Sequence, residues 1–520
     1  MSAPGTMDAV TLQVMGSALR TVAEEMEATL IRAAHSPNIT ERHDCSTALF
    51  DAEGRMVVQS ASIPVHLGAM PEAVAAVRER GAGAGEVWLV NDPYRGGTHL
   101  PDLTMISVLT LDGEPAGYAV TRAHHADIGG MSPGSMPAGS RDLLQEGLVI
   151  PPVRIAAAGR PVEGVLELIL ANTRTPAERA GDLRAQRAAH AVAQARLTEV
   201  AGRHGTATVL AAFRELLAYA ERRTRAAVLE MPDGAYRAED VLEGDGVTDE
   251  DLTIRVEVTI AGDRMRVDFA GTDPAGPGNL NCPPAVTRSA VYFVVRALTD
   301  PDIPASAGAF APVEVLAPEG SLVNALSPAA VAGGNVETSS RIVDVVFLAL
   351  GQAVDVPAQG QGTMNNLTLG GAGFTYYETL GGGQGASASA DGPDGVHVAM
   401  SNTLNTPVEA LETAYPVRIE EYRLREGSGG AGAHRGGEGV VRAVRALVPV
   451  EASVIGERRR RGPRGRAGGR DGAPGRNLLN GRVLPGKWRG HLLPGDVLRI
   501  ETPGGGGYGP PAEAAGDTDD

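Results

Sequence analysis

Cysteine is nearly absent from this sequence of 520 residues, which contains only Cys45 and Cys282. Two cysteines without a metal-binding or redox spacing favour free thiols in a reducing compartment. An apolar run long enough to cross a membrane is also missing, as is a secretory leader. Together these absences predict a cytoplasmic protein that has no disulfide framework and does not bind a membrane.

Basic residues are in the minority, with 46 Lys and Arg against 63 Asp and Glu, for a net charge of -17. An acidic protein of this kind is not expected to bind nucleic acid, because phosphate contacts need a basic surface. The sequence also lacks the phosphate-loop pattern GxxxxGK[ST]. The glycine-rich stretch at 81–85 has no Lys-Ser/Thr after it. We therefore expect no nucleotide site in this chain.

Aromatic residues make up only 4% of the chain, whereas it contains 68 glycines. Helical periodicity at 10–34, 176–203 and 206–229 alternates with strand-like patterns, so the predicted fold class is α+β (mixed α/β) and multidomain. It has a long-helix layer in the middle of the N-terminal half and a Gly-rich β C-terminal region. The predicted divisions are an α+β domain at 1–232, an α/β domain at 233–414, a β-rich domain at 415–510 and a disordered tail at 511–520.

Three of the eleven histidines lie in one stretch, residues 90–131. Its apolar runs 103–111 and 117–121 are separated by Asp-Gly-Glu-Pro, which predicts a β-hairpin. Such a hairpin brings His99 and Asp102 close to the adjacent His124 and His125. Neighbours on a strand face opposite sides, so only one of the two adjacent histidines should join the cluster. Mixed imidazole and carboxylate ligands suit zinc, manganese or iron. Surface loops around an ordinary strand pair are the alternative.

The segments NDPYRGGTHLPD and AHHADIGGMSPGSMP resemble the B-type subunit of the hydantoinase/oxoprolinase family, which includes subunits of acetone and acetophenone carboxylases. The resemblance extends over nearly the whole chain. It implies a metal held by His99, Asp102 and His124. The resemblance then makes Asp92, His125 and Asp127 candidates for catalysis or for orienting the ligands.

Four further residues are candidates for the substrate pocket. His66 lies in IPVHLG and Asp44 precedes the strand before it, and both segments are similar to the family pattern. Asn365 and Asn366 have side chains that suit amides or carbonyls, although a structural turn is the alternative for them. Two positions depart from the family: Ala399 stands where many members have histidine, and Leu404 where many have arginine.

An arginine run at 458–470 is the main basic feature of this acidic chain. One interpretation is a solvated turn between strands. Another is a surface that docks an acidic partner or holds an anionic substrate.

The resemblance implies a metal-dependent B-type subunit of an ATP-dependent enzyme that hydrolyses a cyclic amide such as hydantoin, N-methylhydantoin or a 5-oxoproline-like ring. ATP would act through an actin-like ATPase partner of the hydantoinase A type. The first alternative is a subunit of a ketone carboxylase, which would act on a ketone instead of a ring amide. The second is a non-catalytic scaffold for the ATPase partner, which would need no converging metal ligands.

Overall fold

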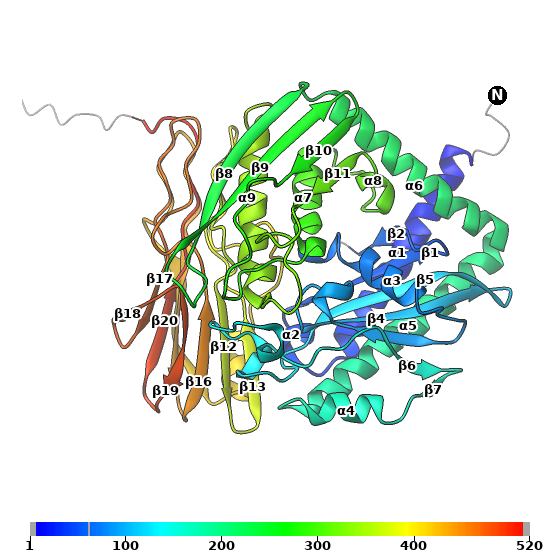
Figure 1. The fold of residues 1–520 in the computed structure, drawn as a ribbon, viewed down its shortest axis with the longest axis horizontal. Coiled ribbons are helices and arrows are strands. Elements are labelled where there is room, and N and C mark those ends of the chain that lie inside the picture. Colours follow the sequence, from blue (N-terminus) through cyan, green and yellow to red (C-terminus); the bar gives the residue numbers. More distant parts are fainter. Residues whose placement is uncertain (1–6, 61–62, 513–520) are drawn as a thin grey trace, which may run out of the picture.

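The computed structural model describes residues 7–60 and 63–512 (Figure 1). Helices are interspersed with strands of four sheets, which confirms the predicted mixed α+β class. Most of the predicted tail, residues 513–520, lies outside the described residues. None of the helices in the described part of the chain is long and apolar enough to cross a membrane.

The N-terminal part is built on an antiparallel sheet with the strand order β2-β1-β5-β4-β3-β6-β7. Successive residues of these strands pack into two different apolar layers. Leu49 packs on one face of the sheet, and Ala48 and Phe50 pack on the other. The sheet is therefore buried on both sides. Its strands are β1 (Cys45–Asp51), β2 (Met56–Gln59), β3 (Val87–Val90), β4 (Asp102–Leu111), β5 (Glu114–His124), β6 (Val153–Ala157) and β7 (Arg160–Pro161).

Long helices cover one face of this sheet, and α3 lies on the other. The long helices form the predicted helical layer (Figure 1), and α6 spans the residues at which the periodicity predicts it. Asp8 caps the first helix by accepting hydrogen bonds from the backbone of Val10 and Thr11. The helices of this part are α1 (Ala9–Ala33), α2 (Pro37–Thr40), α3 (Met70–Arg78), α4 (Val165–Ala171), α5 (Pro176–His204) and α6 (Thr206–Leu229).

The central part contains a second sheet, of order β11-β10-β9-β8, which packs on α7 and α9 (Figure 1). Its alternating apolar residues, such as Ile254, Val256 and Val258, are fully buried or nearly so. A single π-helical turn, Gly334–Thr338, leads directly into α9. The elements are β8 (Gly234–Glu243), β9 (Asp251–Ala261), β10 (Arg264–Asp268), α7 (Pro284–Leu298), α8 (Ala307–Phe310), β11 (Val313–Leu316) and α9 (Ser339–Leu350).

Two further sheets pack face to face through a shared apolar core. Their orders are β13-β12-β16-β19 and β14-β15-β20-β17-β18. The first joins strands from both sides of residue 414, because Leu367 pairs with Val454. The elements are β12 (Asn366–Gly371), β13 (Phe374–Glu378), α10 (Val408–Ala414), β14 (Val417–Arg425), β15 (Gly439–Ala446), β16 (Val450–Ile455), β17 (Arg476–Leu479), β18 (Arg482–Leu484), β19 (Lys487–Leu492) and β20 (Val497–Glu501).

The arginine run at 458–470 is largely paired within the chain. Arg458 is buried and donates to Asp240 at 3.0 Å and to Asp344 at 2.6 Å. Arg461 donates to Asp251 at 2.7 Å. The interpretation as a solvated turn is therefore wrong for Arg458. Much of the charge that could have docked a partner instead ties the C-terminal part to β8, β9 and α9.

Candidate functional site

The hairpin β4–β5 places the first cluster residues. Leu111 pairs with Glu114, so Asp112 and Gly113, with φ of 52° and 85°, form a two-residue turn. The turn is shorter than the predicted Asp-Gly-Glu-Pro segment, because Pro115 lies within β5 beside a register shift. The ladder then brings Asp102 directly opposite His124.

One carboxylate oxygen, Oδ2 of Asp102, is the centre of the cluster. His99 Nδ1 lies 2.9 Å from it, His66 Nε2 lies 3.6 Å from it, and Thr98 Oγ1 donates to it at 2.5 Å. Burial alone would raise the pKa of Asp102, but the neighbouring His99 and His66 hold that pKa well below its usual range. Asp102 is therefore an anion at neutral pH, although it is only 1% exposed.

His124 faces the same cluster from the second strand. Its ring centroid lies 5.0 Å from that of His99, and its Nε2 is buried with no hydrogen-bond partner among the described residues. Burial, together with the neighbouring His99, lowers the pKa of His124 well below its ordinary value. The ring is consequently neutral at pH 7, and a neutral imidazole nitrogen is the form that binds metal.

A cavity of about 20 Å³ lies at the centre of these side chains. A space of this size holds about one water molecule or ion. His66, predicted as a pocket residue, lines it, and its Nδ1 contacts Ser46 Oγ at 2.8 Å. Asp44 also lines it. Burial and the nearby Asp102 raise the pKa of Asp44, although Arg42 opposes this.

Three residues that sequence reasoning missed contact the histidine rings of the cluster, and two of them, Tyr377 and Asn335, line the cavity. Tyr377 in β13 stacks on His124 at 4.4 Å and 3°, and Asn38 in α2 contacts His124 Nδ1 at 3.2 Å. Asn335, in the π-helical turn, contacts His99 Nε2 at 3.5 Å. A π-helical turn within a helix often marks a functional site. Asn38 and Asn335 lie in the segments SPNI and AGGNVETSS, which are also similar to the family pattern, and that similarity was the available signal.

His125 points away from the cluster, as strand alternation requires. Its Nε2 contacts Gln186 Oε1 in α5 at 3.2 Å. Burial is the main reason that its pKa falls to about 4. The structure thus places His124 at the cavity and His125 between the sheet and α5.

Asp92 and Asp127 serve local backbone structure rather than the cluster. Asp92 accepts from the backbone of Tyr94 and caps a short 3-10 turn. Asp127 accepts from the backbone of Gly134 at 3.1 Å and from the side chain of Arg174 at 2.9 Å, which fixes the loop after β5.

Asn365 and Asn366 are buried, and their amides are engaged within the protein. Asn365 accepts from Arg459 at 2.7 Å and has a φ of 49°. Asn366 donates to Glu337 at 2.8 Å and accepts from the Tyr377 hydroxyl at 2.9 Å. Neither lines the cavity at the cluster, but Asn366 positions Tyr377 on His124.

The described residues contain no group of three or more His, Cys, Asp or Glu side chains already arranged to hold a metal ion. The donor set nevertheless fits a divalent cation. It offers a buried, unpartnered nitrogen on His124, a second imidazole and two carboxylates around a space for one ion. Asn38 Nδ2 lies 3.2 Å from His124 Nδ1; exchanging the oxygen and nitrogen of this amide would let the oxygen accept the Nδ1–H and leave the Nε2 lone pair toward the cavity.

Comparison with known proteins identifies the family of this chain. The sequence profile described as Hydantoinase B/oxoprolinase matches residues 8–511. The chain belongs to the hydantoinase B/oxoprolinase family. It is 38% identical to 5-oxoprolinase 1 of Arabidopsis thaliana over 98% of this chain, which spans 42% of that relative's length. It is 32% identical to a putative D-/L-hydantoinase B-type subunit of a Pseudomonas species, covering 98% of this chain and 91% of the relative.

Solved structures confirm the fold of this family member. The ATP-dependent caprolactamase from Pseudomonas jessenii superposes with a TM-score of 0.91 at 32% identity, covering 97% of this chain and 92% of that one. A nucleotide-free acetone carboxylase superposes with a TM-score of 0.87 at 19% identity, covering 96% and 76% of the two chains. The second likeness shows a shared fold.

Proposed function

We propose that this chain is the B-type subunit of an ATP-dependent hydrolase that opens a cyclic amide. The observation that carries the proposal is the buried cluster of His99, Asp102 and His124 around a cavity of about 20 Å³ in a chain of this family. Relatives named as 5-oxoprolinase and as the B-type subunit of a hydantoinase, and a caprolactamase of the same fold, support a ring amide as the substrate class.

We propose that His99, Asp102 and His124 hold a divalent ion, zinc, manganese or iron, with Asp44 as a further oxygen donor. A bound ion of this kind polarises a carbonyl group and lowers the pKa of water. The chain's own residues supply the orientation. Asp102 is held by Thr98 and His66, and His124 is held between Asn38 and Tyr377. The surrounding burial excludes bulk water, which strengthens every electrostatic contact in the site.

ATP is proposed to act through a partner. The sequence has no GxxxxGK[ST] loop, whereas related enzymes are named ATP-dependent. An actin-like ATPase of the hydantoinase A type would activate the amide oxygen by phosphorylation. The activated ring is labile in water, so we expect a stable complex that delivers it to the cluster. The acetone carboxylase fold keeps a ketone carboxylase as the second candidate.

The test compares two adjacent histidines. His124→Ala removes a nitrogen that faces the cavity, and His125→Ala, the matched control, removes one that faces α5. We expect His124→Ala and Asp102→Asn to lower metal affinity by about 10–100-fold or more, measured by elemental analysis and chelator competition. His125→Ala should keep its metal. Full metal retention in both cluster variants, with wild-type circular dichroism, would refute the metal assignment.

The same proteins then test the reaction. Each is assayed in complex with the ATPase partner on 5-oxoproline, hydantoin and caprolactam, and on acetone with bicarbonate. Ring opening that requires ATP and is lost in His124→Ala supports the hydrolase. Consumption of acetone and bicarbonate alone would establish the carboxylase alternative. Wild-type activity in every cluster variant would leave the scaffold as the better account.

A further inference from the structure

The cavity at the cluster is too small for any ring amide. Its volume of about 20 Å³ suits a water molecule or an ion, whereas small-molecule sites occupy about 300–1,000 Å³. The ring must therefore lie in an adjoining space and present only its amide to the cluster. The walls of the larger cavities identify that space.

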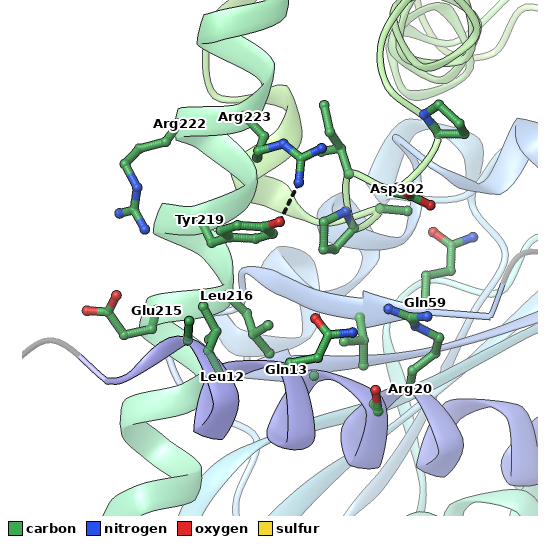
Figure 2. A pocket seen from close by; sticks show the side chains of 18 of the residues that line it. Leu12, Gln13, Arg20, Gln59, Glu215, Leu216, Tyr219, Arg222, Arg223 and Asp302 are labelled. Atoms are coloured by element: carbon green, nitrogen blue, oxygen red, sulfur yellow. Dashed lines mark hydrogen bonds between the residues drawn. The ribbon is translucent and has the colours of Figure 1, made fainter.

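A cavity of about 930 Å³ lies between α1, α6 and residues 301–305 (Figure 2). Residues of α1 such as Gln13 and Arg20 face Tyr219 and Arg223 of α6 across it, and Arg223 donates to the Tyr219 hydroxyl. Among the described residues, none that lines this cavity also lines the cluster cavity. It is therefore not the space that adjoins the cluster.

A second cavity, about 500 Å³, does adjoin the cluster. Ser401 lines both it and the small cavity. Two short segments form the partition between them. In the first, Pro64 faces the larger space and His66 the smaller one. In the second, Ala399 faces the larger space and Met400 the smaller one.

We propose that this second cavity, which we call the side chamber, is the substrate site. It is lined on one side by the apolar residues Phe293, Phe347 and Val398 and at the partition by His397 and Ser401. The hydrocarbon face of a small ring amide packs on the apolar wall, and its amide points past Ser401 toward the cluster. This assignment rests on the proposed function and names the part of the chain that would set its substrate range.

His397 offers a polar group for the amide at the partition. Its Nδ1 contacts Ser401 Oγ at 2.5 Å, while its Nε2 is buried and has no hydrogen-bond partner among the described residues. A buried nitrogen left without a partner is costly unless a ligand satisfies it. Burial and Arg42 lower the pKa of His397 to about 4, although Asn405 opposes this, so the ring is neutral at pH 7 and suits a neutral amide.

The partition is also built with unusual backbone. Ala399 has a φ of 56°, a conformation that residues other than glycine rarely adopt. Such strain is retained where surrounding structure fixes it, most often at ligand sites. Gly360 lies so close to Val398 that a Cβ there would come within 2.6 Å of its Cγ1. The wall of the side chamber therefore depends on close packing around residues 398–401.

A thiol placed at the partition tests the assignment. Both natural cysteines are buried, so Ala399→Cys gives a single reactive position in the side chamber. Ser17→Cys, in the cavity of Figure 2, is the matched control. Separate samples of each variant, in complex with the ATPase partner, are treated with methyl methanethiosulfonate or with benzyl methanethiosulfonate. The labelled and unlabelled samples of the same variant are then compared on the ring amide that the wild type consumes fastest.

We expect the benzyl label at position 399 to lower kcat/KM about tenfold or more, because a blocked chamber loses substrate binding as well as turnover. The methyl label should have the smaller effect. The ring amide should slow labelling at position 399 and leave labelling at position 17 unchanged. If the wild-type complex is active and the benzyl-labelled Ala399→Cys complex has unchanged kinetics, the assignment of the side chamber as the substrate site is overturned and the proposed function is not. A wild-type complex that consumes no ring amide would overturn the proposed function and this inference together.

Discussion

At the scale of single residues, one carboxylate organises the cluster. Asp102 gathers His99, His66 and Thr98 on a single oxygen. Three contacts on one atom fix the direction of the carboxylate and of both rings. His66 lies 3.6 Å from this oxygen and lines the same cavity.

A buried histidine away from the cluster gives a prediction for pH. His190 in α5 lies between Ser107 Oγ at 2.7 Å and Thr121 Oγ1 at 3.0 Å. Burial lowers its pKa to about 3, against about 6.5 in the unfolded chain. The unfolded state therefore binds a proton as pH falls below 6.5 while the folded state does not, so stability present above that pH is lost on acidification.

Because of His190, we expect the unfolding free energy of the wild type to fall by about 2 kcal/mol when the pH is lowered from 7 to 5. His190→Asn keeps a polar group facing both hydroxyls but does not titrate there. Urea unfolding at pH 7, 6 and 5 should show a shallower pH dependence in the variant, by about one proton. Parallel curves for the two proteins would mean that His190 does not stay neutral in the folded state.

At the scale of elements, the β4–β5 hairpin and its neighbour β1 fix the cluster. Gly117 in β5 pairs with Asp51, and a Cβ on it would lie 2.1 Å from the carbonyl oxygen of Phe50. No side chain fits at that distance, so any larger residue must push β1 away from β5. Asp44 immediately precedes β1, and its carbonyl accepts from the backbone of His124 at 3.0 Å.

Gly117→Ala should therefore destabilise the protein by about 2–3 kcal/mol. Gly202→Ala is the matched control, because no atom lies within 4 Å of a Cβ built at that helical position. It should be neutral or stabilise by up to about 1 kcal/mol. Denaturant unfolding of both variants measures the difference. Equal denaturation midpoints for the two variants would show that β1 and β5 can move apart without loss of stability.

At the scale of the whole molecule, buried ion pairs join parts distant in sequence. Arg458 follows β16, whereas its partners Asp240 and Asp344 lie in β8 and α9. Arg341 contacts the same two carboxylates. Burial raises the pKa of Asp344 to about 7 even with Arg341 beside it. Removing one guanidinium therefore leaves a buried carboxylate short of charge compensation.

Arg458→Met should destabilise the protein by about 3 kcal/mol, because breaking a buried pair costs more than the pair itself is worth. Arg461→Met, which removes a half-exposed partner of Asp251, should change stability by less than about 1 kcal/mol. Thermal unfolding of the two variants at pH 7.5 compares them. A similar loss of stability in both variants would show that the buried ion pairs of Arg458 stabilise the protein no more than the exposed pair of Arg461.

Much of the architecture could be predicted from local pattern. The helix at Thr206–Leu229 and the hairpin that brings Asp102 close to His124 and His125 were predicted from periodicity and turn composition. Strand alternation also required one of the two adjacent histidines to turn away. The division into domains stays a prediction, although β12 and β16 share a sheet across one of its boundaries.

The sequence by itself therefore determined the mixed α+β class, the hairpin and the neighbourhood of His99, Asp102 and His124, because these depend on residues close along the chain. Only the tertiary structure decided that Asn38, Asn335 and Tyr377 complete the cluster, and that the arginine run pairs inward. Tyr377 lies 253 positions from its stacking partner, and spacing patterns hold no information at that separation. The packing of whole layers, rather than any local preference, brings such residues together.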